Sequence, residues 1–104
     1  MDKKTAVNLA RKYAEAAIKL DEKPDEIMLF GSYADNNAQY DSDIDIAVIY
    51  DTIKGNILEH YTKLWNLTWD ISTLIEPILL TRDDDPVGFI SEVERTGEII
   101  WEKK

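Results

Sequence analysis

At 104 residues the chain has the size of one domain (1–104) with a modest core, and the absence of cysteine excludes disulfides, thiolate metal sites and cysteine nucleophiles. Its net charge of −9, from 21 acidic and 12 basic residues, and its lack of a basic run argue against direct nucleic-acid binding. No apolar run has the length of a membrane span or a signal-peptide core, so we expect a cytoplasmic protein without membrane contact.

The first half of the chain predicts one helix followed by two strands. Apolar residues at helical spacing favour a helix over 5–20, and the polar, proline-containing segment 21–25 ends it. The short apolar run Ile27–Phe30 predicts the first strand. Ile44–Tyr50, which is rich in β-branched residues, predicts the second strand, and residues 51–55 are expected to form a connecting turn.

The second half predicts a helix, a strand, a helix and a short extended segment. The first of these helices is indicated by apolar residues at helical spacing: Ile57, Leu58, Tyr61, Leu64 and Trp65. Residues 69–80 contain the third strand, which Pro77 interrupts or shortens. Asp85, followed by proline, predicts a helix start, Gly97 predicts its end, and 98–101 is expected to be extended. These elements predict an α/β (α+β) domain with a small mixed sheet backed by helices on one side.

Two carboxylates lie at the start of the second predicted strand. Asp43 and Asp45 are two residues apart, and residues at i and i+2 of a strand project from the same face. Carboxylates held side by side repel one another unless a cation lies between them, and divalent cations such as Mg²⁺ prefer oxygen ligands. The structural alternative to a metal site is that Asp43 belongs to a turn and Asp45 to an exposed sheet edge. Because aspartate is a poor strand former, a functional explanation is favoured.

A Gly-Ser pair follows the first predicted strand. Gly31 would let the backbone turn sharply and approach a phosphate closely. Ser32, expected at the head of a short helix, would offer backbone N–H groups and a hydroxyl to an anion. An ordinary turn is the alternative for this pair taken alone. Together with the two carboxylates, the pair indicates a site for a nucleoside triphosphate and its magnesium.

Gly31-Ser32 follows one predicted strand, and Asp43-Ile44-Asp45 lies at the start of the next strand, after a spacer of ten residues. This combination resembles the signature of the minimal nucleotidyltransferases of the DNA polymerase β-like superfamily. The resemblance extends from Ile27 to the end of the chain. The members of this family that act as antitoxins are described as MntA-like. It implies transfer of a nucleoside monophosphate, AMP from ATP, to a hydroxyl with release of pyrophosphate. It also implies that Gly31 and Ser32 bind the nucleotide and that Asp43 and Asp45 are catalytic ligands of Mg²⁺.

The family also uses a third carboxylate on its third strand. Glu76, flanked by apolar residues, is preferred as the third metal ligand or as the base toward the acceptor hydroxyl, and Asp70 is the alternative. The chain departs from the family where Asp35 and Asn36 replace a basic residue and glycine. A negative charge at Asp35 would face the triphosphate.

Two functions are compatible with the sequence. By resemblance, such domains pair with a helical HEPN-type protein as antitoxin and toxin, in some cases by adenylylating a tyrosine of the partner. The alternative is a module that binds a partner without turnover. Trp65, Trp69 and Trp101 could mark such a partner surface, although at least two are expected in the core. An exposed sheet edge would also allow homo-oligomerisation.

Overall fold

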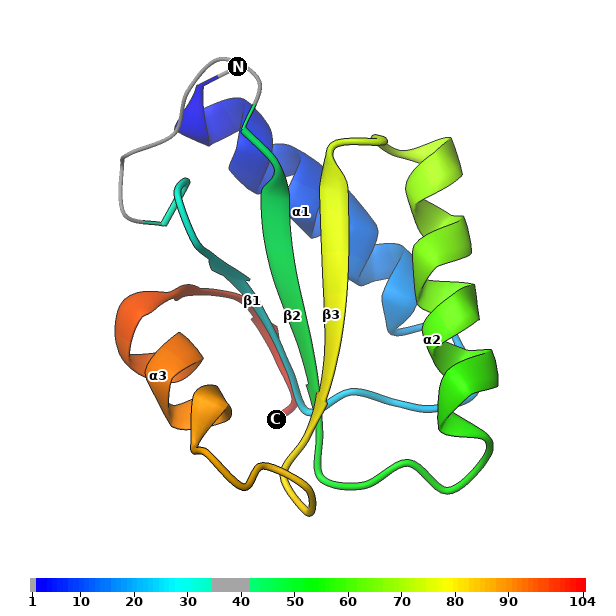
Figure 1. Cartoon of the computed structure of the whole chain (residues 1–104). Coiled ribbons are helices and arrows are strands. Elements are labelled where there is room, and N and C mark those ends of the chain that lie inside the picture. Colours follow the sequence, from blue (N-terminus) through cyan, green and yellow to red (C-terminus); the bar gives the residue numbers. More distant parts are fainter. Residues whose placement is uncertain (1, 35–41) are drawn as a thin grey trace.

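The computed structural model describes residues 2–34 and 42–104 (Figure 1). The helices and strands are, in chain order, α1 (Lys3–Ala17), β1 (Glu26–Phe30), β2 (Ile44–Tyr50), α2 (Ile57–Asn66), the 3₁₀ helix η1 (Leu67–Asp70), β3 (Ile75–Thr81), α3 (Phe89–Thr96) and β4 (Glu98–Glu102). The three longer predicted helices and the predicted strands are present, and β2 has the predicted bounds, but the short helix expected at Ser32 is not found among the described residues. Among the described residues, none of these helices has both the length and the apolar character needed to cross a membrane.

The four strands form one mixed sheet in the order β3-β2-β1-β4. β1 pairs with β2 and with β4 in antiparallel fashion, whereas β2 and β3 are parallel. Parallel neighbours need a crossover connection, and α2 with η1 supplies it. The end of β1 and the starts of β2 and β3 therefore lie at the same end of the sheet, at the top of Figure 1.

Both faces of the central strand β2 are buried, which explains its nearly continuous apolar sequence. One face, which includes Ile46 and Val48, belongs to the core shared with α1 and α2. The other face, which includes Ala47 and Ile49, belongs to a smaller core shared with α3. The mixed α/β fold class is thus confirmed, but the expectation that helices back only one side has to be corrected. α3 covers part of the opposite face because that face also carries apolar side chains (Figure 1).

Proline within β3 is tolerated because β3 is an edge strand. Pro77 has no N–H to donate, and β3 pairs only with β2. The Pro77 carbonyl accepts a hydrogen bond from the Tyr61 hydroxyl of α2 at 3.1 Å. This bond ties the side of α2 to the sheet edge. β3 therefore keeps its full length of seven residues.

Three charged side chains meet where α3 packs on the sheet. Arg82 lies 3.6 Å from the Glu26 carboxylate and 3.2 Å from that of Glu94. Burial raises the pKa of Glu26 to about 7, and a shared hydrogen bond with Glu94 and its negative charge act in the same direction. Arg82 opposes this shift because its positive charge favours ionised Glu26. The folded protein therefore binds a proton at Glu26 more tightly than the unfolded chain does.

This raised pKa predicts a specific pH dependence of stability. The contribution of protonated Glu26 to the free energy of unfolding is fully present below pH 4.5, the ordinary glutamate value, and is lost as the pH rises to about 7. Glu26→Gln should therefore be more stable than the wild type at pH 8, and this difference should shrink toward pH 4.5. Urea unfolding of both proteins across this range measures it. A difference that stays constant with pH would contradict the assignment.

Candidate active site at the carboxylate end of the sheet

Strand register brings three of the candidate residues into neighbouring positions. Asp45 of β2 lies opposite Phe30, the last residue of β1, and opposite Glu76 of β3. Asp43 precedes Asp45 by two residues. The candidate carboxylates therefore gather at one end of the sheet, on the face that α3 covers only in part. Residues that are 31 positions apart in the sequence become neighbours because β2 and β3 are parallel.

Gly31 lies directly against the Asp45 carboxylate. Its backbone has a φ of +74°, a conformation that favours glycine. A Cβ atom built on Gly31 would collide with Oδ2 of Asp45 and lie 3.2 Å from its Cγ. Two separate constraints, the backbone conformation and the close approach of a carboxylate, thus require glycine at this position.

The three carboxylates influence one another's ionisation. Burial raises the pKa of Asp45, the negative charge of Asp43 adds to this, and a hydrogen bond with Glu76 opposes it. At Glu76, the pKa is raised first by the charge of Asp43, then by burial, and then by interactions with Asp43 and Asp45. The negative charges of this cluster therefore repel one another. Such mutual repulsion is relieved by a bound cation as well as by a proton.

The carboxylate oxygens of Asp43, Asp45 and Glu76 suit an oxygen-preferring cation, although in this structure the three side chains do not converge on one position. Among residues 2–34 and 42–104, no three acidic, histidine or cysteine side chains converge closely enough to hold a metal ion. Asp45 is half-buried, whereas Asp43 and Glu76 are exposed at the ends of their strands. Exposed side chains change rotamer readily, so these two carboxylates can turn toward an ion next to Asp45.

The Gly-Ser segment forms a turn. Residues 31–34 are in turn conformation, and within the described part of the chain no helix begins at Ser32, contrary to expectation. Ser32 is half-buried beside Gly31. Tyr33 is buried in the main core. Asp35 and Asn36, where the sequence departs from the family pattern, lie outside the described residues.

Asp70, the alternative third carboxylate, lies elsewhere. It is exposed in η1, on the connection between α2 and β3. It is not among the groups that shift the pKa values of Asp45 and Glu76. Of the two candidates, strand register therefore places Glu76 beside Asp45.

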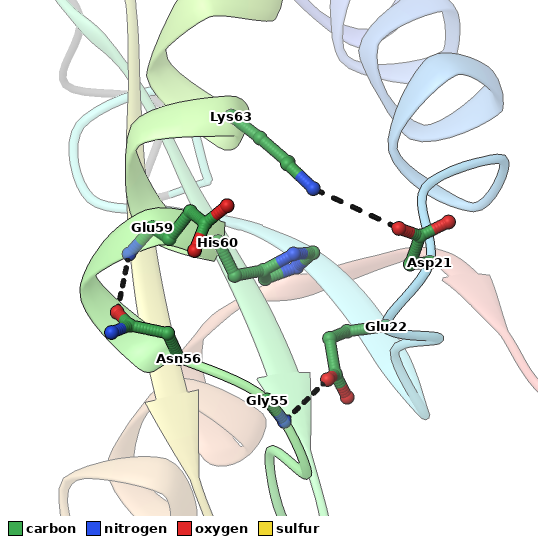
Figure 2. A pocket seen from close by; sticks show the side chains of 7 residues that line it. All are labelled: Asp21, Glu22, Gly55, Asn56, Glu59, His60 and Lys63. Atoms are coloured by element: carbon green, nitrogen blue, oxygen red, sulfur yellow. Dashed lines mark hydrogen bonds and ion pairs between the residues drawn. The ribbon is translucent and has the colours of Figure 1, made fainter.

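A separate cavity lies at the opposite end of the sheet, by the start of α2. It has a volume of about 190 Å³ and is lined by Asp21, Glu22, Gly55, Asn56, Glu59, His60 and Lys63 (Figure 2). Glu22 accepts a hydrogen bond from the Gly55 N–H at 2.7 Å, and Nε2 of His60 lies 2.6 Å from the Tyr50 hydroxyl. These contacts join the loop before β1 to the start of α2. Burial lowers the pKa of His60, which favours the neutral ring that this packing needs.

The tryptophans differ from expectation. Trp65 and Trp69 are exposed, and only Trp101 is partly buried and packs against the main core. The expectation that at least two tryptophans lie in the core was therefore wrong. Of the apolar residues that predicted α2, Leu64 is buried and Tyr61 packs against the main core, whereas Ile57, Leu58 and Trp65 are exposed.

Comparison with known proteins gives matches that share this architecture. Residues 12–104 match the protein family described as polymerase beta, nucleotidyltransferase. The solved structure of a candidate nucleotidyltransferase from Sulfolobus solfataricus is similar over 97% of this chain and 84% of its own, with 20% identity and a TM-score of 0.67. No curated protein matches this chain by sequence.

Two further solved structures are toxin–antitoxin complexes. One, with AMP-PNP, is similar over 90% of this chain and 74% of that chain, with 26% identity and a TM-score of 0.58. The other is a mutant of MntA–HpeT with two aspartates changed to glutamate. It is similar over 100% of this chain and 76% of that chain, with 23% identity and a TM-score of 0.52.

Proposed function

Because this chain belongs to the polymerase β nucleotidyltransferase family, we propose that it transfers a nucleoside monophosphate from a triphosphate to a hydroxyl group. ATP is the proposed donor, AMP the transferred group and pyrophosphate the leaving group. The single observation that carries the proposal is the meeting of Asp45 with Gly31 and Glu76 at one end of the sheet. A carboxylate cluster beside a glycine turn is the arrangement that a metal-bound triphosphate needs.

Each residue has a proposed part in this reaction. Asp43, Asp45 and Glu76 hold Mg²⁺, which would neutralise charge on the transferring phosphoryl group and lower the pKa of the attacking hydroxyl. Gly31 leaves room for a phosphate to approach the backbone, because no side chain projects from it. Ser32 offers its hydroxyl and its N–H to phosphate oxygens. The raised pKa values of Asp45 and Glu76 fit these roles, since cation binding releases the repulsion between the carboxylates.

A protein is the proposed source of the acceptor hydroxyl. Two of the similar structures are toxin–antitoxin complexes, one of them with AMP-PNP, an analogue of ATP. We propose that this chain likewise acts with a protein partner, a helical HEPN-type toxin, as the antitoxin of the pair. The strongly acidic composition also argues for a protein acceptor over a nucleic acid.

Calorimetric titration of ATP into the protein tests the nucleotide site. We expect binding with Mg²⁺, no binding with EDTA, and loss of binding in Asp43→Asn/Asp45→Asn. The double variant should remain folded, and without metal it should be at least as stable as the wild type, because two repelling charges have been removed. No metal-dependent binding by the wild type, or equal binding by the variant, would overturn the proposed site.

Partner binding without turnover is the second candidate function. The observation in its favour is the exposure of Leu58, Trp65 and Trp69, since large apolar side chains on a surface often mark protein contacts. If Asp43→Asn/Asp45→Asn keeps full control of the partner, this second function applies. If the variant still binds the partner but loses control of it, catalysis is required.

A further inference from the structure

An apolar stripe runs along the outer flank of α2 and η1. Leu58 is 73% exposed, Trp65 42% and Trp69 77%. Leu58 and Trp65, seven residues apart, lie on one side of α2, and Trp69 is exposed in η1, which directly follows α2. Thr62, which is exposed and uncharged, lies between Leu58 and Trp65 on the same side. We refer to Leu58, Thr62, Trp65 and Trp69 as the α2 stripe.

The backbone under the stripe is well fixed. The Thr62 hydroxyl donates to the Leu58 carbonyl at 3.0 Å, and the Thr68 hydroxyl donates to the Trp65 carbonyl at 2.7 Å. Leu64 and Thr68, on the inner side, are buried. The tryptophans therefore project to solvent from an anchored helix, and their exposure is a property of the folded domain.

The stripe and the candidate active site lie on opposite faces of the sheet, near the edge strand β3. Tyr61, one helical turn from both Leu58 and Trp65, bonds the carbonyl of Pro77, and Pro77 directly follows Glu76. The edge strand β3 thus lies between the stripe and the carboxylate cluster. The η1 end of the stripe leads into the start of β3, at the end of the sheet that carries the cluster (Figure 1). A protein docked on the stripe would reach the cluster by extending around the edge strand β3.

The surroundings of the stripe are acidic. Residues 55–81 contain three carboxylates, those of Glu59, Asp70 and Glu76, and one basic side chain, Lys63. Lys63 is paired with Asp21 at 3.7 Å. The whole chain carries a net charge of −9. A partner with positive charge around an apolar face would complement this surface.

Charge argues against a second copy of this chain as the occupant, because the small apolar area leaves much of any contact to the rim. The exposed parts of Leu58, Trp65 and Trp69 amount to roughly 400 Å², taking about 150–250 Å² for a whole aromatic side chain. A stable interface buries about 800 Å² on each partner, so half of the contact would have to come from the rim. Between two copies the rims are both acidic and repel. With a basic partner they attract.

We propose that the α2 stripe docks an amphipathic helix of a basic protein partner. Apolar side chains of that helix pack against the two tryptophans, while its Lys and Arg residues meet Glu59 and Asp70. A part of the same partner that extends around the edge strand β3 would bring a hydroxyl group to the carboxylate cluster. In this last respect the inference rests on the proposed transferase function, whereas the docking itself does not.

A labelled synthetic helical peptide with leucine on one face and lysine on the other provides the probe, and fluorescence anisotropy measures its binding. We expect the wild type to bind and Leu58→Ser/Trp69→Ser to lose at least about tenfold in affinity, because aromatic anchors dominate interface energetics. Thr62→Lys, which removes no apolar side chain, should also weaken binding by adding a positive charge to the stripe. Bound peptide should protect Trp65 and Trp69 from acrylamide quenching.

The matched control is Val87→Ser/Ile99→Ser, which removes two exposed apolar side chains outside the stripe and should leave binding unchanged. Three results would overturn the proposal: no peptide binding, equal binding by Leu58→Ser/Trp69→Ser, or self-association in sedimentation that this variant abolishes. The last result would identify a second copy as the occupant. Magnesium-dependent ATP binding, measured on the same variant, should be unchanged, so failure of docking is distinguished from failure of the nucleotide site.

Discussion

Gly31→Ala is expected to destabilise the domain and to impair nucleotide binding together. The positive φ of Gly31 costs an L-residue about 1–2 kcal/mol. The added Cβ would also collide with the Asp45 carboxylate, so Asp45 must move out of its position beside Glu76. Thermal or urea unfolding measures the first effect, and calorimetry with ATP and Mg²⁺ measures the second.

Gly88→Ala is the matched control for this substitution. Gly88 has a similar φ of +71°, but nothing lies within 4 Å of a Cβ built there. Gly88→Ala should therefore lose only the stability that a positive φ costs an L-residue, and it should bind the nucleotide as the wild type does. Combining Gly31→Ala with Asp45→Ala removes the colliding carboxylate, so the double variant should be less destabilised than the sum of the single changes. Equal effects of the two glycine substitutions on stability and binding would contradict the role of the Gly31–Asp45 contact.

Glu76→Gln should strongly weaken magnesium-dependent ATP binding. Loss of groups that merely support metal ligands lowers metal affinity by about 10–100-fold, so loss of a ligand should lower it at least about tenfold. The substitution should not lower the stability of the metal-free protein at neutral pH. The pKa of Glu76 is raised by the charge of Asp43, so ionised Glu76 opposes folding above that pKa and glutamine removes the repulsion.

Asp70→Asn provides the control. Asp70, like Glu76, is an exposed carboxylate, and it lies in η1, shortly before the strand β3 that carries Glu76. Asp70→Asn should leave ATP binding unchanged. If Asp70→Asn weakens binding and Glu76→Gln does not, the third carboxylate has been assigned to the wrong residue.

Local patterns in the sequence predicted the elements well because each element depends on its own side chains. The β-branched run Ile44–Tyr50 predicted β2 with its bounds. The helix predicted to start at Asp85 begins at Phe89 instead, and the Asp85 carboxylate accepts hydrogen bonds from the N–H groups of Phe89 and Ile90, its first two residues. Gly97 ends α3 as expected. The Asp43-x-Asp45 spacing predicted two neighbouring carboxylates, of which Asp45 lies in β2 and Asp43 directly before its start.

Burial could not be predicted in the same way because it depends on which surfaces meet. The periodicity of α2 did not show that Leu58 and Trp65 face solvent, nor that His60 is buried against Tyr50. The sequence likewise did not place α3 on the second face of the sheet. Both outcomes follow from the packing of helices on a sheet whose two faces are apolar.

The sequence by itself thus determined the α/β class, the order of the elements and the glycine and aspartates of the candidate site. The sequence preferred Glu76 to Asp70, but only the tertiary structure placed Glu76 beside Asp45, because the parallel register of β2 and β3 brings together residues far apart in the chain. It alone also showed that Gly31 lies against Asp45 and that Trp65 and Trp69 are left uncovered. Local propensity acts within a few residues, whereas contacts across the sheet and exposure of a helix flank exist only once the strands have paired.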